Sequence, residues 1–269
     1  MRITVILGGV VAVLLAIVSL GGLVAPGMYV RESADWATQA VAQDGFDLAV
    51  AAPVIAGATL ATSLGSRRAA VVLAGGLVFA AYTLAIYCFS IHFNAMFLIY
   101  VATLGLAGWG LLALAIDLAR RIEPIEARGA RLAGGVLIAI GVAFSLLWLA
   151  EDLPAVLGNR TPASLTETGL FTNPVHVIDL AFVLPVHVLA GVWLLRRRGA
   201  GELLGPVVLA FGVLMAASIG GMLVVMYARG FAAPLPVIGA MAVTAIVTAA
   251  VLIRVLRPHS GVVFAGHAR

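Results

Sequence analysis

The sequence predicts an all-α membrane protein in which eight transmembrane helices form two parallel four-helix repeats. Of the 269 residues, 63% are hydrophobic and 10% are charged, and the mean hydropathy is +1.14. A soluble domain is about half apolar and about one quarter charged. The apolar residues fall into runs of membrane-spanning length, and the arginines gather at alternate connections between these runs. This composition excludes a soluble enzyme, a nucleic-acid-binding domain and a disordered chain.

Eight apolar runs are long enough to cross a bilayer, which requires about 20 mostly apolar residues per helix. They are residues 3–24, 47–65, 70–90, 95–117, 132–150, 178–195, 204–226 and 235–256. The first run follows Arg2 and resembles a signal peptide. Its apolar stretch is longer than the usual core of about 7–15 residues, so we expect a membrane helix there.

The charge distribution predicts the orientation of these helices. All sixteen basic residues are arginines, and the net charge is +4. With a cytoplasmic N-terminus, thirteen arginines lie inside and only Arg31, Arg160 and Arg229 lie outside, which satisfies the positive-inside rule. The thirteen are Arg2, Arg67, Arg68, Arg120, Arg121, Arg128, Arg131, Arg196, Arg197, Arg198, Arg254, Arg257 and Arg269. The basic balance therefore indicates a plasma-membrane topology with both termini cytoplasmic, and not nucleic-acid binding.

Two halves of four helices resemble each other in sequence. The segment DLAVAAPV, which begins at Asp47, matches DLAFVLPV, which begins at Asp179, at five of eight positions. An even number of helices in each half makes the two repeats parallel. We expect a first repeat at 1–131, a second at 132–256 and a cytoplasmic tail at 257–269, all within one membrane domain.

Three segments resemble a family of uncharacterised multi-pass membrane proteins from bacteria. They are Gln43-Asp44, the run HFNAMFL from His92 to Leu98, and the run NPVHVID from Asn173 to Asp179. The resemblance covers most of the chain and implies a polytopic membrane fold. It implies no activity.

Asp47 and Asp179 are the first candidate functional residues. Each begins a predicted helix on the outer side, and a proline follows six residues later. An aspartate at a helix start can simply cap backbone N–H groups. Alternatively, the two acids face a cavity between the halves, where the prolines open each helix near its mouth.

His187 is a second candidate, because the sequence places it about 13 Å inside the outer end of its helix, near the bilayer centre. A polar side chain at this depth is a functional candidate unless a neighbour satisfies it. His176, Asp179 and His187 lie on nearly one helical face and form a candidate proton pathway. The alternative is a histidine that is hydrogen-bonded to a backbone carbonyl.

No cofactor or metal is predicted. His176 and His187 lie about 16 Å apart along the helix, which is too far for one metal ion. His92 and His176 could meet near the outer surface, so haem remains a minor alternative. Neither a CxxCH nor an HExxH pattern is present in the sequence.

The remaining candidates lie at the outer ends of helices. Asn94 continues a polar stripe with Tyr87, which is either a cavity lining or an interfacial belt with helix-packing hydroxyls. Glu151 and Asp152 end the fifth predicted helix and open a long outer loop. An anionic rim of this kind can attract cations, and it is also an ordinary solvated surface.

Three functions remain open at this level. Small-molecule or proton-linked transport fits the duplicated bundle, the paired acids and the prolines. A non-catalytic subunit or assembly factor of a membrane complex fits the scarcity of deep polar residues. Partners in such a complex, or further copies in a homo-oligomer, are then expected. An enzyme acting on a lipophilic substrate would use Asp47, Asp179, Glu151 and Asp152 as acids near the outer interface. In each case we expect the lipid bilayer to be the main partner.

Overall fold

The computed structural model describes residues 2–120 and 127–257, and these residues fold as a bundle of long helices without a strand. Eight helices are long and apolar enough to cross a membrane. Residues 121–126 and 258–269, which include Arg121, Arg269 and most of the predicted tail, lie outside the described part.

The first four-helix unit contains α1 (Arg2–Val24), α4 (Arg67–Ser90), α5 (Phe97–Ala119) and one composite helix. The composite helix runs through α2 (Ala34–Phe46), η1 (Asp47–Ala51) and α3 (Ala52–Ser63). It begins thirteen residues before the predicted start at residue 47. The hydropathy pattern did not predict the first turns, because they carry Asp35, Gln39, Gln43 and Asp44. The polar groups of these side chains form hydrogen bonds within the protein.

The second unit contains α6 (Ala127–Leu157), α10 (Gly199–Ala228), α11 (Leu235–Leu256) and a second composite helix. This helix runs through α8 (Pro174–Ile178), η2 (Asp179–Val183) and α9 (Leu184–Leu195). The short α7 (Ala163–Thr168) lies in the outer connection. Helix α6 continues seven residues beyond its predicted end, through Pro154, because Glu151 and Asp152 find partners within the protein.

Both composite helices contain a five-residue π-helical segment that starts at an aspartate. In each, the N–H after the segment donates to the carbonyl of that aspartate, from Ala52 to Asp47 and from Leu184 to Asp179. Pro53 and Pro185 lie two residues after the ends of these π-helical segments. Because proline lacks an N–H and its ring crowds the preceding turn, a wider turn accommodates it. The aspartates thus lie within continuous helices and do not cap helix starts.

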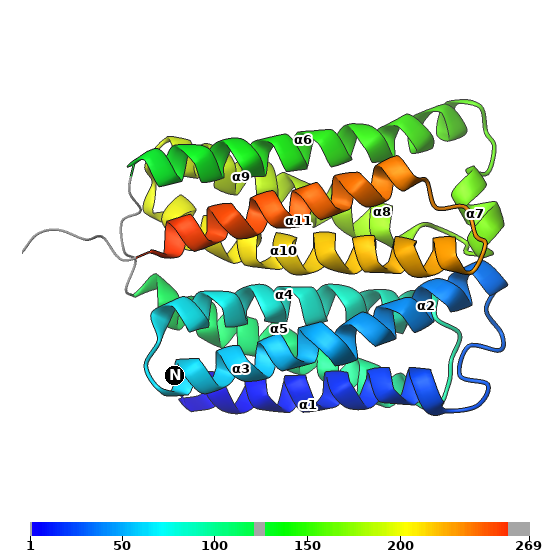
Figure 1. Ribbon diagram of the computed structural model, residues 1–269, viewed down its shortest axis with the longest axis horizontal. Coiled ribbons are helices and arrows are strands. Elements are labelled where there is room, and N and C mark those ends of the chain that lie inside the picture. The colour runs from blue at the N-terminus through cyan, green and yellow to red at the C-terminus, as the bar shows by residue number, and fades with distance from the viewer. Residues whose placement is uncertain (1, 121–126, 258–269) are drawn as a thin grey trace, which may run out of the picture.

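The two units pack side by side, and each shows the same order of neighbours (Figure 1). In the first unit α1 and α4 each contact α3 and α5, and in the second α6 and α10 each contact α9 and α11. Helices α4 and α10 form the main contact between the units. The contact is close at Gly75, where an added Cβ would lie 2.5 Å from the Ala210 Cβ and 2.7 Å from the Phe211 nitrogen.

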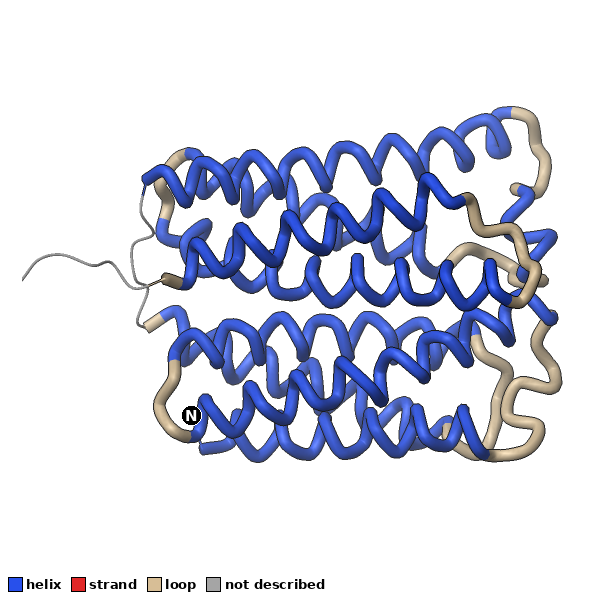
Figure 2. Tube along the Cα trace, viewed as in Figure 1, coloured by secondary structure: helices blue, strands red, loops and turns tan. Residues whose placement is uncertain are grey.

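The long helices run roughly parallel to one another, and the loops lie at the two ends of the bundle (Figure 2). The described chain begins and ends at the same end, where arginines flank α3–α4 and α9–α10. We call this the arginine end and the opposite one the outer end. Many large apolar side chains between the ends are exposed, as expected for lipid contact.

Candidate functional site

Asp44 is the most enclosed carboxylate in the described structure, with an exposed fraction of 0%. The Tyr29 hydroxyl donates to its Oδ2 at 2.6 Å, and the Tyr87 hydroxyl donates to its Oδ1 at 2.9 Å. Gly22 on α1 faces this carboxylate, and a Cβ there would overlap it. Three separate segments therefore converge on Asp44, which the sequence had placed in an outer loop.

A network of tyrosines surrounds Asp44. Burial, followed by the neighbouring Asp44 carboxylate, raises the pKa of Tyr29 well above its ordinary value of 10.0. Tyr29 therefore stays protonated and donates its hydrogen bond to the carboxylate. Tyr29 also interacts with Tyr100, whose hydroxyl accepts a hydrogen bond from the Asn94 amide at 3.2 Å. Asn94 thus belongs to the edge of this network.

Asp47 lies one turn further along the same helix, with an exposed fraction of 1%. The Gln43 amide donates to its Oδ1 at 2.8 Å. The Gln43 carbonyl oxygen in turn accepts a hydrogen bond from the Ser218 hydroxyl at 2.7 Å. Ser218 lies on α10, so Asp47 in the first unit is connected through one side chain to the second unit.

Asp179 has the reciprocal connection. The Trp148 indole donates to its Oδ2 at 2.9 Å, and the Tyr82 side chain lies close to the same carboxylate. Tyr82 lies on α4 in the first unit and packs against Phe211 on α10. Each π-helical aspartate is therefore associated with a polar side chain from the opposite unit, Asp47 through a hydrogen-bonded chain over Gln43 and Asp179 through its proximity to Tyr82.

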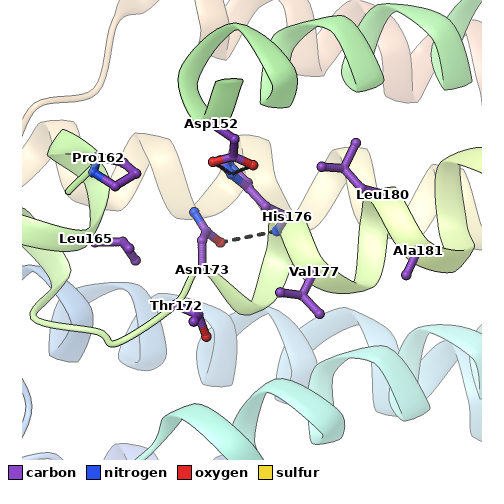
Figure 3. Close-up of a pocket in the computed structure, with 9 residues that line it drawn as sticks. All are labelled: Asp152, Pro162, Leu165, Thr172, Asn173, His176, Val177, Leu180 and Ala181. Carbon is purple, nitrogen blue, oxygen red and sulfur yellow. Dashed lines mark hydrogen bonds and ion pairs between the residues drawn. The ribbon is translucent and has the colours of Figure 1, made fainter. Parts of the chain in front are cut away.

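A pocket of about 480 Å³ lies on the outer side of Asp179, entirely within the second unit (Figure 3). Asp152 from α6 and His176 from α8 meet there, with the His176 Nδ1 at 3.0 and 3.1 Å from the two carboxylate oxygens. The His176 ring stacks on Trp148 with centroids 4.4 Å apart. Trp148 thus contacts both His176 beside the pocket and Asp179 behind it.

His187 is hydrogen-bonded to a backbone carbonyl, which was the alternative to a place in a proton pathway. Its Nδ1 donates to the Val183 carbonyl at 2.8 Å, and its ring contacts Phe211 edge-on. Because a carbonyl only accepts, this bond places the proton on Nδ1. His176 and Asp179 share Trp148, but no described hydrogen bond joins His187 to either of them.

The other predicted candidates hold the outer connections together. His92 binds Glu32 through its ring Nδ1 at 3.0 Å and through its backbone N–H at 2.7 Å. Glu151 accepts a hydrogen bond from the backbone N–H of Ser164 at 3.3 Å. His92 and His176 thus bind different carboxylates.

Sequence reasoning missed Asp44 with its partner Tyr29, and it missed Ser218. The signal for Asp44 was present in the spacing Gln43-Asp44-x-x-Asp47, which puts three polar side chains on adjacent turns of one helix. Ser218 carried no such signal, because a lone serine in an apolar run usually serves helix packing. Only the contact between the units reveals its partner.

The search for similar proteins gave no match. No family model, no curated protein and no solved structure resembles this chain significantly. In the described part of the chain, no group of three or more His, Cys, Asp or Glu side chains is placed to hold a metal ion.

The arrangement is suited to binding protons or small cations within a membrane. Asp44, Asp47 and Asp179 are buried in long apolar helices, where each accepts hydrogen bonds from hydroxyl, amide or indole groups. Such groups are neutral, so they stabilise a carboxylate without cancelling its charge. Ionisable residues in this setting typically form ion or proton pathways.

Proposed function

We propose that this chain is a bacterial inner-membrane protein that transports a small solute or protons between its two four-helix units. The single observation that carries this proposal is the reciprocal contact across the units. Asp47 connects through hydrogen bonds of Gln43 to Ser218, and Asp179 lies close to Tyr82. A change in protonation at either acid would therefore affect the contact between the units, as alternating access requires.

The proposal includes an origin by internal duplication, with repeats at 1–131 and 132–256. The matched segments that start at Asp47 and Asp179 both contain a π-helical segment followed by a proline. The order of helix neighbours is the same in both units. These features support two parallel repeats related by an axis along the membrane normal.

We further propose that the arginine end faces the cytoplasm. Arginines flank the α3–α4 and α9–α10 connections and the end of α11, all at the same end of the bundle. The positive-inside rule then places both described chain ends inside. The tyrosine network, the pocket and α7 face the opposite side.

Proton flux into liposomes tests the transport function. The purified protein is reconstituted with pyranine inside, and a potassium diffusion potential is imposed with valinomycin. We expect acidification with the wild type, and a fall to the level of protein-free liposomes with Asp47→Asn and Asp179→Asn.

Asp35→Asn is the matched control. Asp35 lies on α2 and also accepts a hydrogen bond from a glutamine four residues away, Gln39, but it lies near the outer start of that helix. We expect it to retain wild-type flux. A wild type without flux, or Asp47 and Asp179 variants with full flux, would contradict proton-linked transport.

A second candidate is a non-catalytic subunit of a membrane complex. The close approach of α4 and α10 at Gly75 favours it, because two helices that pack with their backbones this close form a rigid contact. Native mass spectrometry from native membranes tests this alternative. A stoichiometric partner supports it, and a chain that carries flux alone at its own mass of 27.6 kDa contradicts it.

A further inference from the structure

The outer pocket combines one carboxylate with apolar walls. Asp152 and His176 lie next to each other in its lining (Figure 3). Leu165 from α7 and Val177 and Leu180 from the composite helix form apolar parts of the lining. Its volume of about 480 Å³ lies within the range of small-molecule sites.

We propose that this pocket binds a small organic cation, an ammonium group that carries apolar substituents. When the imidazole of His176 is neutral, its Nδ1–H donates to Asp152 and the pair keeps one negative charge. A cation beside the pair would balance that charge, while its alkyl groups would contact the leucine and valine side chains. The assignment of this ligand as the transported solute rests on the proposed transport function.

The charge of the whole outer end supports a cation. Among the described residues five acidic side chains that are not buried lie toward this end, against three arginines. The acids are Glu32, Asp35, Glu151, Asp152 and Glu167, and the arginines are Arg31, Arg160 and Arg229. Arg160 is exposed and does not line the pocket. A negative surface of this kind raises the local concentration of cations and disfavours anions.

The ligand set favours an organic cation over a metal ion. A metal at the pocket would have Asp152 and His176 as its strong protein ligands, whereas protein metal sites commonly use three or four. The Asn173 side-chain oxygen already accepts from the backbone N–H groups of Val175 and His176. An alkylammonium needs only a carboxylate and an apolar surface.

The position of the pocket connects the ligand to the interface between the units. Leu180 and Ala181 in its lining belong to the π-helical segment that begins with Asp179. Trp148 stacks on His176 and donates to Asp179. A cation held by Asp152 would thus lie on the outer side of the acid that we place in the pathway.

Equilibrium binding to the full-length protein tests the site without any transport step. Choline and 3,3-dimethylbutan-1-ol form the probe pair, because a trimethylammonium group replaces a tert-butyl group of the same shape. Isothermal titration at pH 8 should show saturable choline binding and at least about tenfold weaker binding of the alcohol, the ratio expected from one ion pair of about 1.4 kcal/mol.

Three variants locate the binding. Asp152→Asn should weaken choline binding about tenfold. Thr172→Trp, at an exposed lining position, should block the pocket without touching the Asp152–His176 pair. Glu167→Gln removes the same charge from α7 at a position outside the lining, and it should bind as the wild type does. The thermal midpoint of each variant verifies that it is folded.

The outcomes separate this inference from the transport function. Equal binding of both probes, no binding of choline, or undiminished binding to folded Asp152→Asn or Thr172→Trp would overturn the site. Choline binding by a protein that conducts no protons would leave the site standing and contradict the transport function. Proton flux that needs Asp179, in a protein that does not bind choline, would support the transport function and contradict the binding site.

Discussion

A glycine makes room for Asp44, the most buried carboxylate among the described residues. Asp44 approaches α1 at Gly22, and the hydroxyl of Tyr29 lies in the same space, 2.6 Å from where a Cβ would be. The carboxylate accepts hydrogen bonds there from Tyr29 and Tyr87, which compensate part of the loss of hydration. The arrangement of three polar groups therefore depends on the absence of one methyl group.

Replacement of this glycine should disrupt the cluster. Gly22→Ala would displace the Asp44 carboxylate from Tyr29, and we expect it to reduce the free energy of unfolding by about 1–3 kcal/mol, as overpacking typically does. Gly9→Ala on the same helix is the control, because nothing lies within 4 Å of its added Cβ. Thermal unfolding in detergent measures both. Equal midpoints for the two variants would contradict the assigned role of Gly22.

The sequence predicted some site residues and missed others for a clear physical reason. Asp47 and Asp179 were found because each pairs with a proline in a matched segment. Asp44 was missed because four further polar residues precede it in its helix, which led to the prediction of a loop there. Burial inside a membrane bundle depends on neighbours such as Tyr29 and Gly22, which lie far from Asp44 in sequence.

At the scale of elements, the sequence predicted the number and order of the spans more accurately than their outer ends. Eight long apolar helices are confirmed in the described residues. Runs that are apolar to both ends, such as 235–256, have the predicted limits. The helices that begin at Ala34 and end at Leu157 differ, because their outer turns carry polar side chains that bind other protein groups.

The pair α4–α10 sets how closely the two units approach. An added Cβ at Gly75 would collide with backbone atoms of Ala210 and Phe211, which cannot rotate away. We expect Gly75→Ala to lower stability by about 1–3 kcal/mol, and by more if the helices cannot separate. Because the contact joins the units, the same variant should also weaken the link between Gln43 and Ser218.

Gly105→Ala provides the comparison for this contact. Gly105 lies on α5, and nothing is within 4 Å of its added Cβ. The thermal midpoint in detergent should fall for Gly75→Ala and stay close to the wild type for Gly105→Ala. A Gly75→Ala protein as stable as the wild type would show that α4 and α10 separate readily, which would favour transport over a fixed scaffold.

At the scale of the whole molecule, the two ends of the bundle differ in chemistry. The arginine end has short connections at α3–α4 and α9–α10, whereas the outer end carries α7, the pocket and most of the acids. The sequence predicted this polarity from its arginines alone. It could not predict the pocket, because that requires α6, α7 and the second composite helix to meet.

The proposed orientation makes a direct prediction about accessibility in intact cells. In a Cys88→Ala background, Thr161→Cys at the outer end and Leu64→Cys at the arginine end each provide one thiol at an exposed position. A membrane-impermeant maleimide should label Thr161→Cys in intact cells and Leu64→Cys only after permeabilisation. The reverse pattern would contradict the cytoplasmic arginine end and would place the pocket inside. It would also change which compartment supplies a cation to Asp152.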